Sequence, residues 1–167
     1  LCEREGVKVE LRLGDLADLS LLRGDSVDLV VSAYAFGYVE DLTRVFRQAH
    51  RVLKKSGYLV FSLPHPSYDM IDDDHPLEPL RIRRSYFDRE PIDYEWNGVS
   101  FTDHHHTVAD MVNGLVRAGY RLDTLLEPEP VTAGPRSSFW SETFQYVLPT
   151  MIFTARPERA WTGHLPP

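Results

Sequence analysis

The chain has 167 residues, of which 43% are hydrophobic and 26% are charged. This composition favours one globular domain with a hydrophobic core over a disordered chain. The net charge of −7 argues against a nucleic-acid partner, because nucleic-acid-binding surfaces concentrate lysine and arginine. No apolar run approaches the roughly 20 residues that cross a bilayer, and no signal peptide opens the chain. We expect a cytoplasmic protein that binds a small molecule and neither nucleic acid nor membrane, with its oligomeric state left open.

The amino-terminal residues have the pattern of a helix end followed by a strand. The first residue is leucine, and LCEREG resembles a last helical turn closed by Gly6, so we expect preceding elements to be missing. Residues 7–13 alternate apolar and charged side chains and stop at Gly14, which predicts a strand with one more polar face. The apolar run SVDLVVSA, residues 26–33, predicts a strand buried on both faces.

A helix and another buried strand come next. Asp41 has the side chain of a helix N-cap, and apolar residues recur at helical spacing until Lys54, Lys55 and the stop at Gly57. YLVFSL, residues 58–63, predicts a buried strand. Two apolar strands joined through one helix form a βαβ unit, which implies a parallel sheet with a right-handed crossover.

Residues 69–106 show neither helical nor strand periodicity and are too long for an ordinary connection. They hold ten acidic residues against four arginines, so most of the net charge of the chain lies there. Aromatic residues are frequent in and just before this segment, which favours an apolar substrate lid with polar tips. We interpret residues 69–106 as a substrate-lid insertion, with a locally packed loop as the alternative.

One helix and two strands complete the chain. Thr107 and Asp110 have the spacing of a capping box, and the apolar stripe that follows predicts a helix that ends at Gly119. Residues 120–127 predict a strand. Residues 149–155 predict the final strand, with a proline at its first position, where the missing N–H is tolerated.

Four segments in this order resemble the class I S-adenosylmethionine-dependent methyltransferases, specifically their small-molecule branch. The segments are LRLGDLADL, DSVDLVVSAYAFGYVED, VFRQAHRVLKKSGYLVFS and LVRAGYRLDTLLEPEP. The resemblance implies an α/β fold with a partial Rossmann-like sheet, mostly parallel with an antiparallel final strand. The glycine-rich loop after the first strand of that family is absent. We therefore expect a single methyltransferase-like domain over residues 1–167 that lacks its first βα units and binds the cofactor weakly.

In an open α/β sheet the ligand binds at the carboxyl ends of the strands, and the resemblance implies S-adenosylmethionine there. It assigns the adenine amino group to Asp15 and an adenine ring nitrogen to the Leu16 N–H, next to Gly14; capping of the following turn is the alternative for Asp15. The backbone carbonyls of Ser32 and Ala33 would hold the ammonium group of the cofactor, with an ordinary strand end as the alternative. Three aromatic rings would face its sulfonium through cation–π attraction, with packing of their loop as the alternative; they are Tyr34, Phe36 and Tyr38.

Two histidines are candidate catalytic residues. His65 follows the strand at 58–63 and would act as a general base if the acceptor needs deprotonation, with shaping of the exit turn as the alternative. His105 is a candidate for contact with the substrate, and a loop before the helix is its alternative. We expect no metal site in DHHHT (103–107), because adjacent side chains diverge and no cysteine or HExxH partner exists.

The sequence therefore predicts methyl transfer from S-adenosylmethionine to a small molecule. An NAD-dependent Rossmann oxidoreductase stays open, because it shares the βαβ pattern, although no Tyr-x-x-x-Lys occurs. A non-catalytic remnant that binds a ligand or partner through the insertion also stays open. The methylated atom is undetermined, since in-line displacement relies on alignment and often needs no acid or base.

Overall fold

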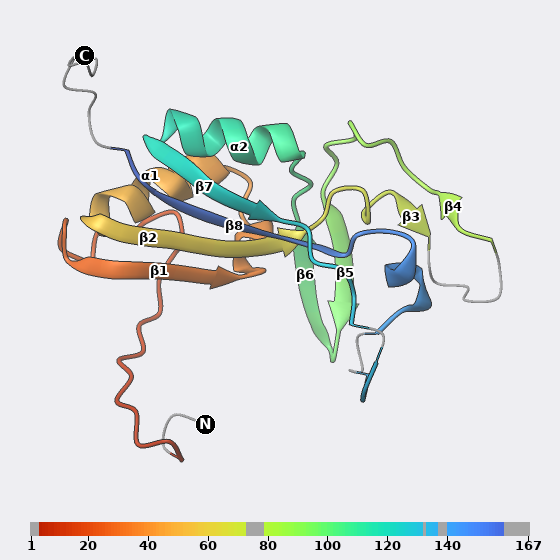
Figure 1. Cartoon of the computed structure of the whole chain (residues 1–167), viewed down its shortest axis with the longest axis horizontal. Helices are drawn as coiled ribbons and strands as arrows, with labels where there is room; N and C mark the ends of the chain where they lie inside the picture. The colour runs from red at the N-terminus through yellow and green to blue at the C-terminus, as the bar shows by residue number, and fades with distance from the viewer. Residues whose placement is uncertain (1–3, 73–78, 132, 137–139, 159–167) are drawn as a thin grey trace.

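A four-stranded sheet forms the centre of the protein, in the order β1-β2-β8-β7. In the computed structural model, β1 and β2 pair in parallel, whereas β8 lies antiparallel between β2 and β7. Three strands thus run in one direction and the last one opposes them (Figure 1), which confirms a mostly parallel sheet with an antiparallel final strand. The strands are β1 (Val27–Ala33), β2 (Leu53–Pro64), β7 (Tyr120–Leu126) and β8 (Thr150–Pro157). The structure describes residues 4–72, 79–131, 133–136 and 140–158.

Helix α1 (Leu42–Val52) connects β1 to β2. The Asp41 carboxylate accepts a hydrogen bond from the Arg44 N–H at 3.0 Å, so the predicted N-cap is confirmed. The helix ends at Val52, and the prediction that it continues to the stop at Gly57 was wrong. Leu53 already has extended backbone angles and begins β2, because it pairs with Val27 of β1.

Helix α2 (Val108–Arg117) precedes β7. Thr107 and Asp110 exchange the reciprocal hydrogen bonds of a capping box, as the sequence predicts. Gly119 ends the helix with a positive φ of 82°, a conformation that glycine adopts without steric cost.

The core lies between the two helices and one face of the sheet. Phe61 of β2 stacks on Phe153 of β8 with ring centroids 4.7 Å apart, and Phe46 of α1 packs on Phe61 at 5.3 Å. Burial of this apolar surface is the main contribution to folding. The core residues include Val45, Phe46, Ala49, Leu59, Phe61, Leu63, Met111, Leu115, Met151, Phe153 and Ala155.

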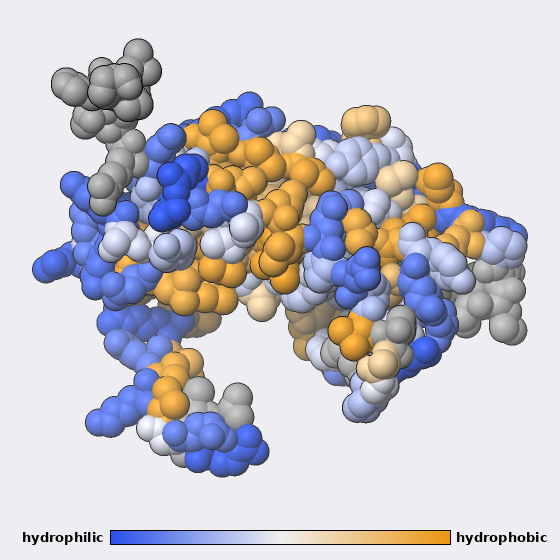
Figure 2. Space-filling model, viewed as in Figure 1, coloured by the Kyte–Doolittle hydropathy of each residue, from blue (hydrophilic) through white to orange (hydrophobic). Residues whose placement is uncertain are grey.

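The opposite face of the sheet is apolar and exposed. Leu29 and Val31 of β1 are 51% and 64% exposed, and Leu126 of β7 is 52% exposed. Figure 2 shows hydrophobic surface over the front of the sheet. The prediction that residues 26–33 are buried on both faces was therefore wrong, because β1 is an edge strand of the described sheet.

Residues 7–13 form no strand, so that prediction was also wrong. Leu11 is 88% exposed, and Leu13 is fully exposed. A strand is stabilised by pairing and by burial of one face, and this segment has neither within the described sheet. The predicted helix end before Gly6 lies partly outside the described residues.

The insertion contains two hairpins that the sequence analysis missed. Strand β3 (Ile71–Asp72) pairs with β4 (Arg81–Ile82), and β5 (Ile92–Trp96) pairs with β6 (Val99–Asp103). The β5–β6 turn is Asn97-Gly98, with both φ angles positive. Asn-Gly is a strong two-residue hairpin signal, so this hairpin was predictable. Both hairpins lie beyond the carboxyl ends of β1 and β2 (Figure 1).

Replacing Gly57 with alanine should destabilise the protein. The added methyl would lie 2.9 Å from the Asp28 carbonyl oxygen and 2.9 Å from a methyl group of buried Leu53. Overpacking of this kind costs about 1–3 kcal/mol, measurable by urea denaturation. Ser56→Ala, at the exposed neighbouring position, is the control and should change the unfolding free energy by less than about 0.5 kcal/mol. Equal stability of the two variants would contradict this packing.

Candidate functional site

A cavity of about 610 Å³ opens at the carboxyl ends of β1 and β2. Tyr34 follows β1, Pro64 ends β2 and Thr150 begins β8, while Asp69 and Asp103 come from the insertion. Ligands of open α/β sheets bind at this edge, so we take this cavity as the candidate site. Its other lining residues are Tyr68, Ile71, Arg83, Ile92, Phe144 and Pro149.

Tyr34 has a left-handed backbone with a φ of 60°, which is unusual for a non-glycine residue and frequent at functional sites. Its N–H donates to the Ser62 carbonyl at 3.0 Å. Because the peptide is trans, the Ala33 carbonyl points the opposite way, toward the open edge of β1. The Tyr34 hydroxyl is 2.5 Å from the Thr150 hydroxyl. An outward-pointing backbone carbonyl and an aromatic side chain thus lie where β1 ends.

Ser32 is 8% exposed, and its hydroxyl has no hydrogen-bond partner among the described residues. A buried polar group without a partner costs free energy. The hydroxyl therefore has the capacity to bind an additional polar group at the end of β1.

The other two predicted aromatic residues differ in their surroundings. Phe36 is 4% exposed and packs against Phe46 and Phe61 in the core, which leaves its ring no open face for a ligand. Tyr38 is 44% exposed, and its hydroxyl is 3.3 Å from that of Tyr94. Cofactor contact by either residue stays a prediction.

The structure places the predicted adenine residues apart from the cavity. The Asp15 carboxylate accepts a hydrogen bond from the Ala17 N–H at 2.8 Å, and Arg44 of α1 donates to the Ala17 carbonyl at 3.0 Å. Gly14, Asp15 and Leu16 are absent from the residues that line the cavity. The turn that they form is anchored to α1, and their role in cofactor binding stays a prediction.

Hydrogen bonds connect the insertion to the loop that follows β1. The His104 N–H donates to the Gly37 carbonyl at 2.8 Å, and the His106 Nε2–H donates to the Val39 carbonyl at 2.8 Å. Burial lowers the pKa of His106, which favours the neutral ring. The Tyr38 ring also lies 5.7 Å from that of Phe101 in β6. These contacts hold the insertion beside the edge where β1 ends.

His105 joins three parts of the insertion. Its side chain is fully buried, its Nδ1 is 2.7 Å from the Asp69 carboxylate, and its Nε2 is 2.9 Å from the Tyr86 carbonyl. The ring therefore bridges the Asp69 side chain and the Tyr86 backbone through both of its nitrogens. Neither ring nitrogen is open to a substrate in this arrangement. The predicted substrate contact is untested, and the geometry supports anchoring of the insertion.

His65 also uses both ring nitrogens. Its Nδ1 accepts a hydrogen bond from the Ser67 N–H at 3.2 Å, so the proton resides on Nε2 and points to Glu127 at 3.2 Å. His65 is 9% exposed and is not among the residues that line the cavity. It joins the end of β2 to the residue after β7, and its predicted role as a base stays untested.

The carboxylates of Asp69 and Asp103, for which the sequence predicted no role in the site, line the cavity. Burial raises the pKa of Asp103, and the negative charge of Asp69 raises it further, although His104 and the Tyr94 hydroxyl act in the opposite direction. A carboxylate in such an environment is a candidate to bind a proton or a cation.

Asp103→Asn should raise stability near neutral pH. The folded pKa lies above the unfolded value of 3.8, so the folded state binds more protons and stability falls as pH rises through the folded pKa. Asparagine removes this dependence and retains an oxygen for Tyr94. The urea midpoint of the variant should exceed that of the parent at about pH 7 and equal it below about pH 3.5. A lower midpoint at neutral pH would contradict this environment.

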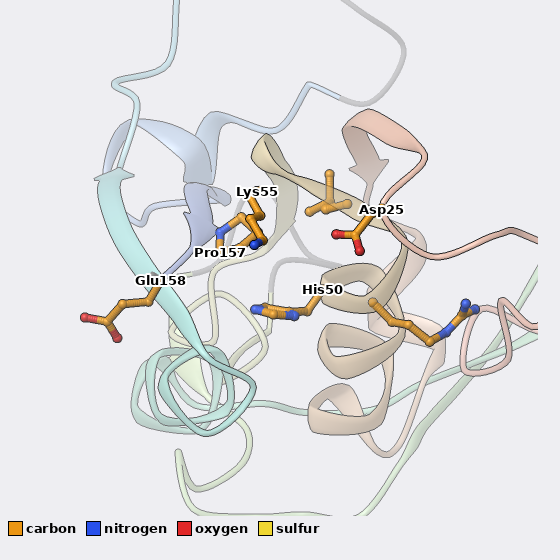
Figure 3. A pocket seen from close by; sticks show the side chains of 7 residues that line it. Asp25, His50, Lys55, Pro157 and Glu158 are labelled. Atoms are coloured by element: carbon orange, nitrogen blue, oxygen red, sulfur yellow. The ribbon is translucent and has the colours of Figure 1, made fainter. Parts of the chain in front are cut away.

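A second cavity, of about 740 Å³, lies at the opposite edge of the sheet. His50, Lys55, Asp25 and Glu158 surround it, from α1, β2 and the segments next to β1 and β8 (Figure 3). Although it is larger, it lies at the amino ends of β1 and β2, away from the edge at which open α/β sheets bind ligands.

Among the described residues, no group of three or more histidine, cysteine, aspartate or glutamate side chains is arranged to hold a metal ion. No helix within the described ranges has the length and apolarity to span a membrane.

The chain is similar to known methyltransferases. A family model described as a methyltransferase domain matches residues 1–61. The structure of an S-adenosylmethionine-dependent methyltransferase from Mesorhizobium loti is 29% identical, with a TM-score of 0.67 over 86% of this chain and 67% of that chain. These similarities support a class I S-adenosylmethionine-dependent methyltransferase.

One curated relative and one further solved structure are also similar to this chain. The uncharacterised methyltransferase YbaJ of Bacillus subtilis is 26% identical over 128 residues, which cover 72% of this chain and 50% of the relative. A protein from Listeria monocytogenes, proposed to be an S-adenosylmethionine-dependent methyltransferase, shares the fold with a TM-score of 0.70 at 19% identity, over 87% of this chain and 68% of that chain. The chain spans half the length or less of the curated relatives that it matches.

Proposed function

We propose that this chain contributes to the transfer of a methyl group from S-adenosylmethionine to a small molecule in the cytoplasm. The supporting observation is the 610 Å³ cavity, which lies where β1 and β2 end and is walled on its other side by the insertion. Such a cavity has the size of a small-molecule site. The net charge of −7 argues against a nucleic-acid acceptor.

The end of β1 has groups that fit the amino-acid part of the cofactor. The outward Ala33 carbonyl would accept a hydrogen bond from the cofactor ammonium, and the unpartnered Ser32 hydroxyl would accept another. The Tyr34 ring is 45% exposed and would face the sulfonium. The cofactor supplies a methyl group on a positively charged sulfur, and these residues would orient it. The resemblance adds Asp15 and Leu16 as the adenine contacts.

We propose that residues 69–106 act as the substrate lid. The rings of Tyr94 and Phe101 stack at 5.4 Å across the β5–β6 hairpin, and the following residues are bonded to Gly37 and Val39. Alignment of donor and acceptor supplies much of the acceleration in methyl transfer, and a lid fixed beside the end of β1 would maintain that alignment.

Calorimetry with S-adenosylhomocysteine and with NAD tests this proposal on the chain of 167 residues. We expect S-adenosylhomocysteine to bind with a Kd above about 1 μM, which is a binding free energy weaker than about 8 kcal/mol, because this chain lacks the glycine-rich loop. Tyr34→Ala should weaken this binding, whereas the control Tyr146→Ala, at an 80% exposed position, should not. Tighter binding of NAD would favour an oxidoreductase, and binding of neither would favour a non-catalytic remnant.

A further inference from the structure

The polar wall of the cavity points to the chemistry of the acceptor. Asp69 and Asp103 line the main cavity and a small adjoining one beside Gly37 and His106. The Asp103 Oδ1 lies 3.8 Å from the position that a Cβ on Gly37 would occupy. This carboxylate therefore lies against the loop that follows β1, next to the proposed methyl donor.

The two carboxylates differ in how their charges are compensated. Asp69 pairs with the fully buried His105 at 2.7 Å. Asp103 lies near the Tyr94 hydroxyl, which acts to lower its pKa, and forms no ion pair with a lysine or arginine of the described residues. Its raised pKa reports a negative charge that its surroundings stabilise poorly. A cation in the cavity would supply the missing stabilisation.

The apolar wall of the cavity is aromatic. Tyr68 and Phe144 pack edge to face with ring centroids 5.5 Å apart, and Tyr34 lines the same cavity. Aromatic faces attract ammonium groups and also accommodate apolar groups. A carboxylate next to aromatic rings therefore complements a molecule with a cationic amine on a hydrocarbon body.

We propose that the methyl acceptor is a small molecule with a protonated amine, which pairs with Asp103 while the hydrocarbon part lies against Tyr68 and Phe144. This inference rests on the proposed function. Arg83 lines the same cavity and is exposed. It would favour a carboxylate-bearing acceptor instead, so the experiment compares the two charges directly.

Two probes of similar size and opposite charge separate these possibilities. Tyramine carries an ammonium group, and 3-(4-hydroxyphenyl)propionate carries a carboxylate on the same phenol. Calorimetry with the 167-residue chain near neutral pH should show that tyramine binds at least about tenfold more tightly, as expected for one charge-assisted hydrogen bond. Asp103→Asn should remove this preference. The control Asp93→Asn changes net charge equally at an exposed position bonded to Thr102 and should retain it.

Three results would overturn the inference: equal or tighter binding of the propionate, unchanged tyramine affinity in Asp103→Asn, or no binding of either probe. Affinity for S-adenosylhomocysteine, measured on the same samples, distinguishes failure of the amine acceptor from failure of the proposed methyltransferase function. Retained cofactor binding without the ammonium preference rejects the amine acceptor alone. Loss of S-adenosylhomocysteine binding in the parent chain rejects the proposed function. Melting temperatures establish that each variant is folded.

Discussion

Phe153→Ala should be among the most destabilising single substitutions in the chain, with a loss of about 3–5 kcal/mol in the free energy of unfolding. Phe153 is completely buried in β8, the strand between β2 and β7, and its ring stacks on Phe61 at 4.7 Å with an interplanar angle of 4°. Truncation removes apolar burial and leaves a cavity where α1, β2 and β8 meet.

Urea denaturation followed by circular dichroism measures this loss. Leu126→Ala, at a 52% exposed position on β7, is the control and should cost less than about 1 kcal/mol. Phe153→Leu should fall between the two, because it retains part of the buried surface. A loss below about 1 kcal/mol for Phe153→Ala would show that β8 is not a central strand.

His105→Ala should cost about 1–3 kcal/mol in the free energy of unfolding, because it leaves buried polar groups without a hydrogen-bond partner. The substitution removes the two ring nitrogens that contact the Asp69 carboxylate and the Tyr86 carbonyl. The Asp69 side chain is 19% exposed, so water compensates part of the loss.

A double-mutant cycle identifies the origin of this loss. Asp69→Ala combined with His105→Ala should cost less than the sum of the two single substitutions, because no carboxylate is then left unpaired. Hydrogen exchange should be faster in β5 and β6 of His105→Ala, while amides of β2 and β8 remain protected. Additive costs, or a stable His105→Ala, would contradict the anchoring role and leave the predicted substrate contact open.

Short sequence motifs predicted where the two helices begin. The Asp41 cap and the Thr107–Asp110 box are formed by neighbouring residues, so each helix start could be predicted from a few positions. The environment of a strand depends on more distant residues. Residues 7–13 and 26–33 have strand-like patterns, but the first segment has no pairing partner in the described sheet and the second is at its edge.

The site was predictable to a similar extent. Strand ends selected Ala33 and Tyr34 as candidates, because the ligand-binding edge of an α/β sheet follows from strand direction, and their contact with the cofactor stays a prediction. Asp103 was missed as a site residue, because its place beside Gly37 depends on a hairpin that folds back on the loop after β1. The histidines were selected by residue type, and only the structure shows that the ring nitrogens of His65 and His105 already have partners.

Amide chemical-shift mapping of the 167-residue chain during titration with S-adenosylhomocysteine tests the central claim most directly. The proposed methyltransferase site predicts that the largest shifts occur at the ends of β1 and β2, around Ala33 and Tyr34, and at Thr150, which bonds to Tyr34. Largest shifts at His50 and Lys55, in the cavity at the opposite edge, would contradict the assignment of the site, as would the absence of any localised shift.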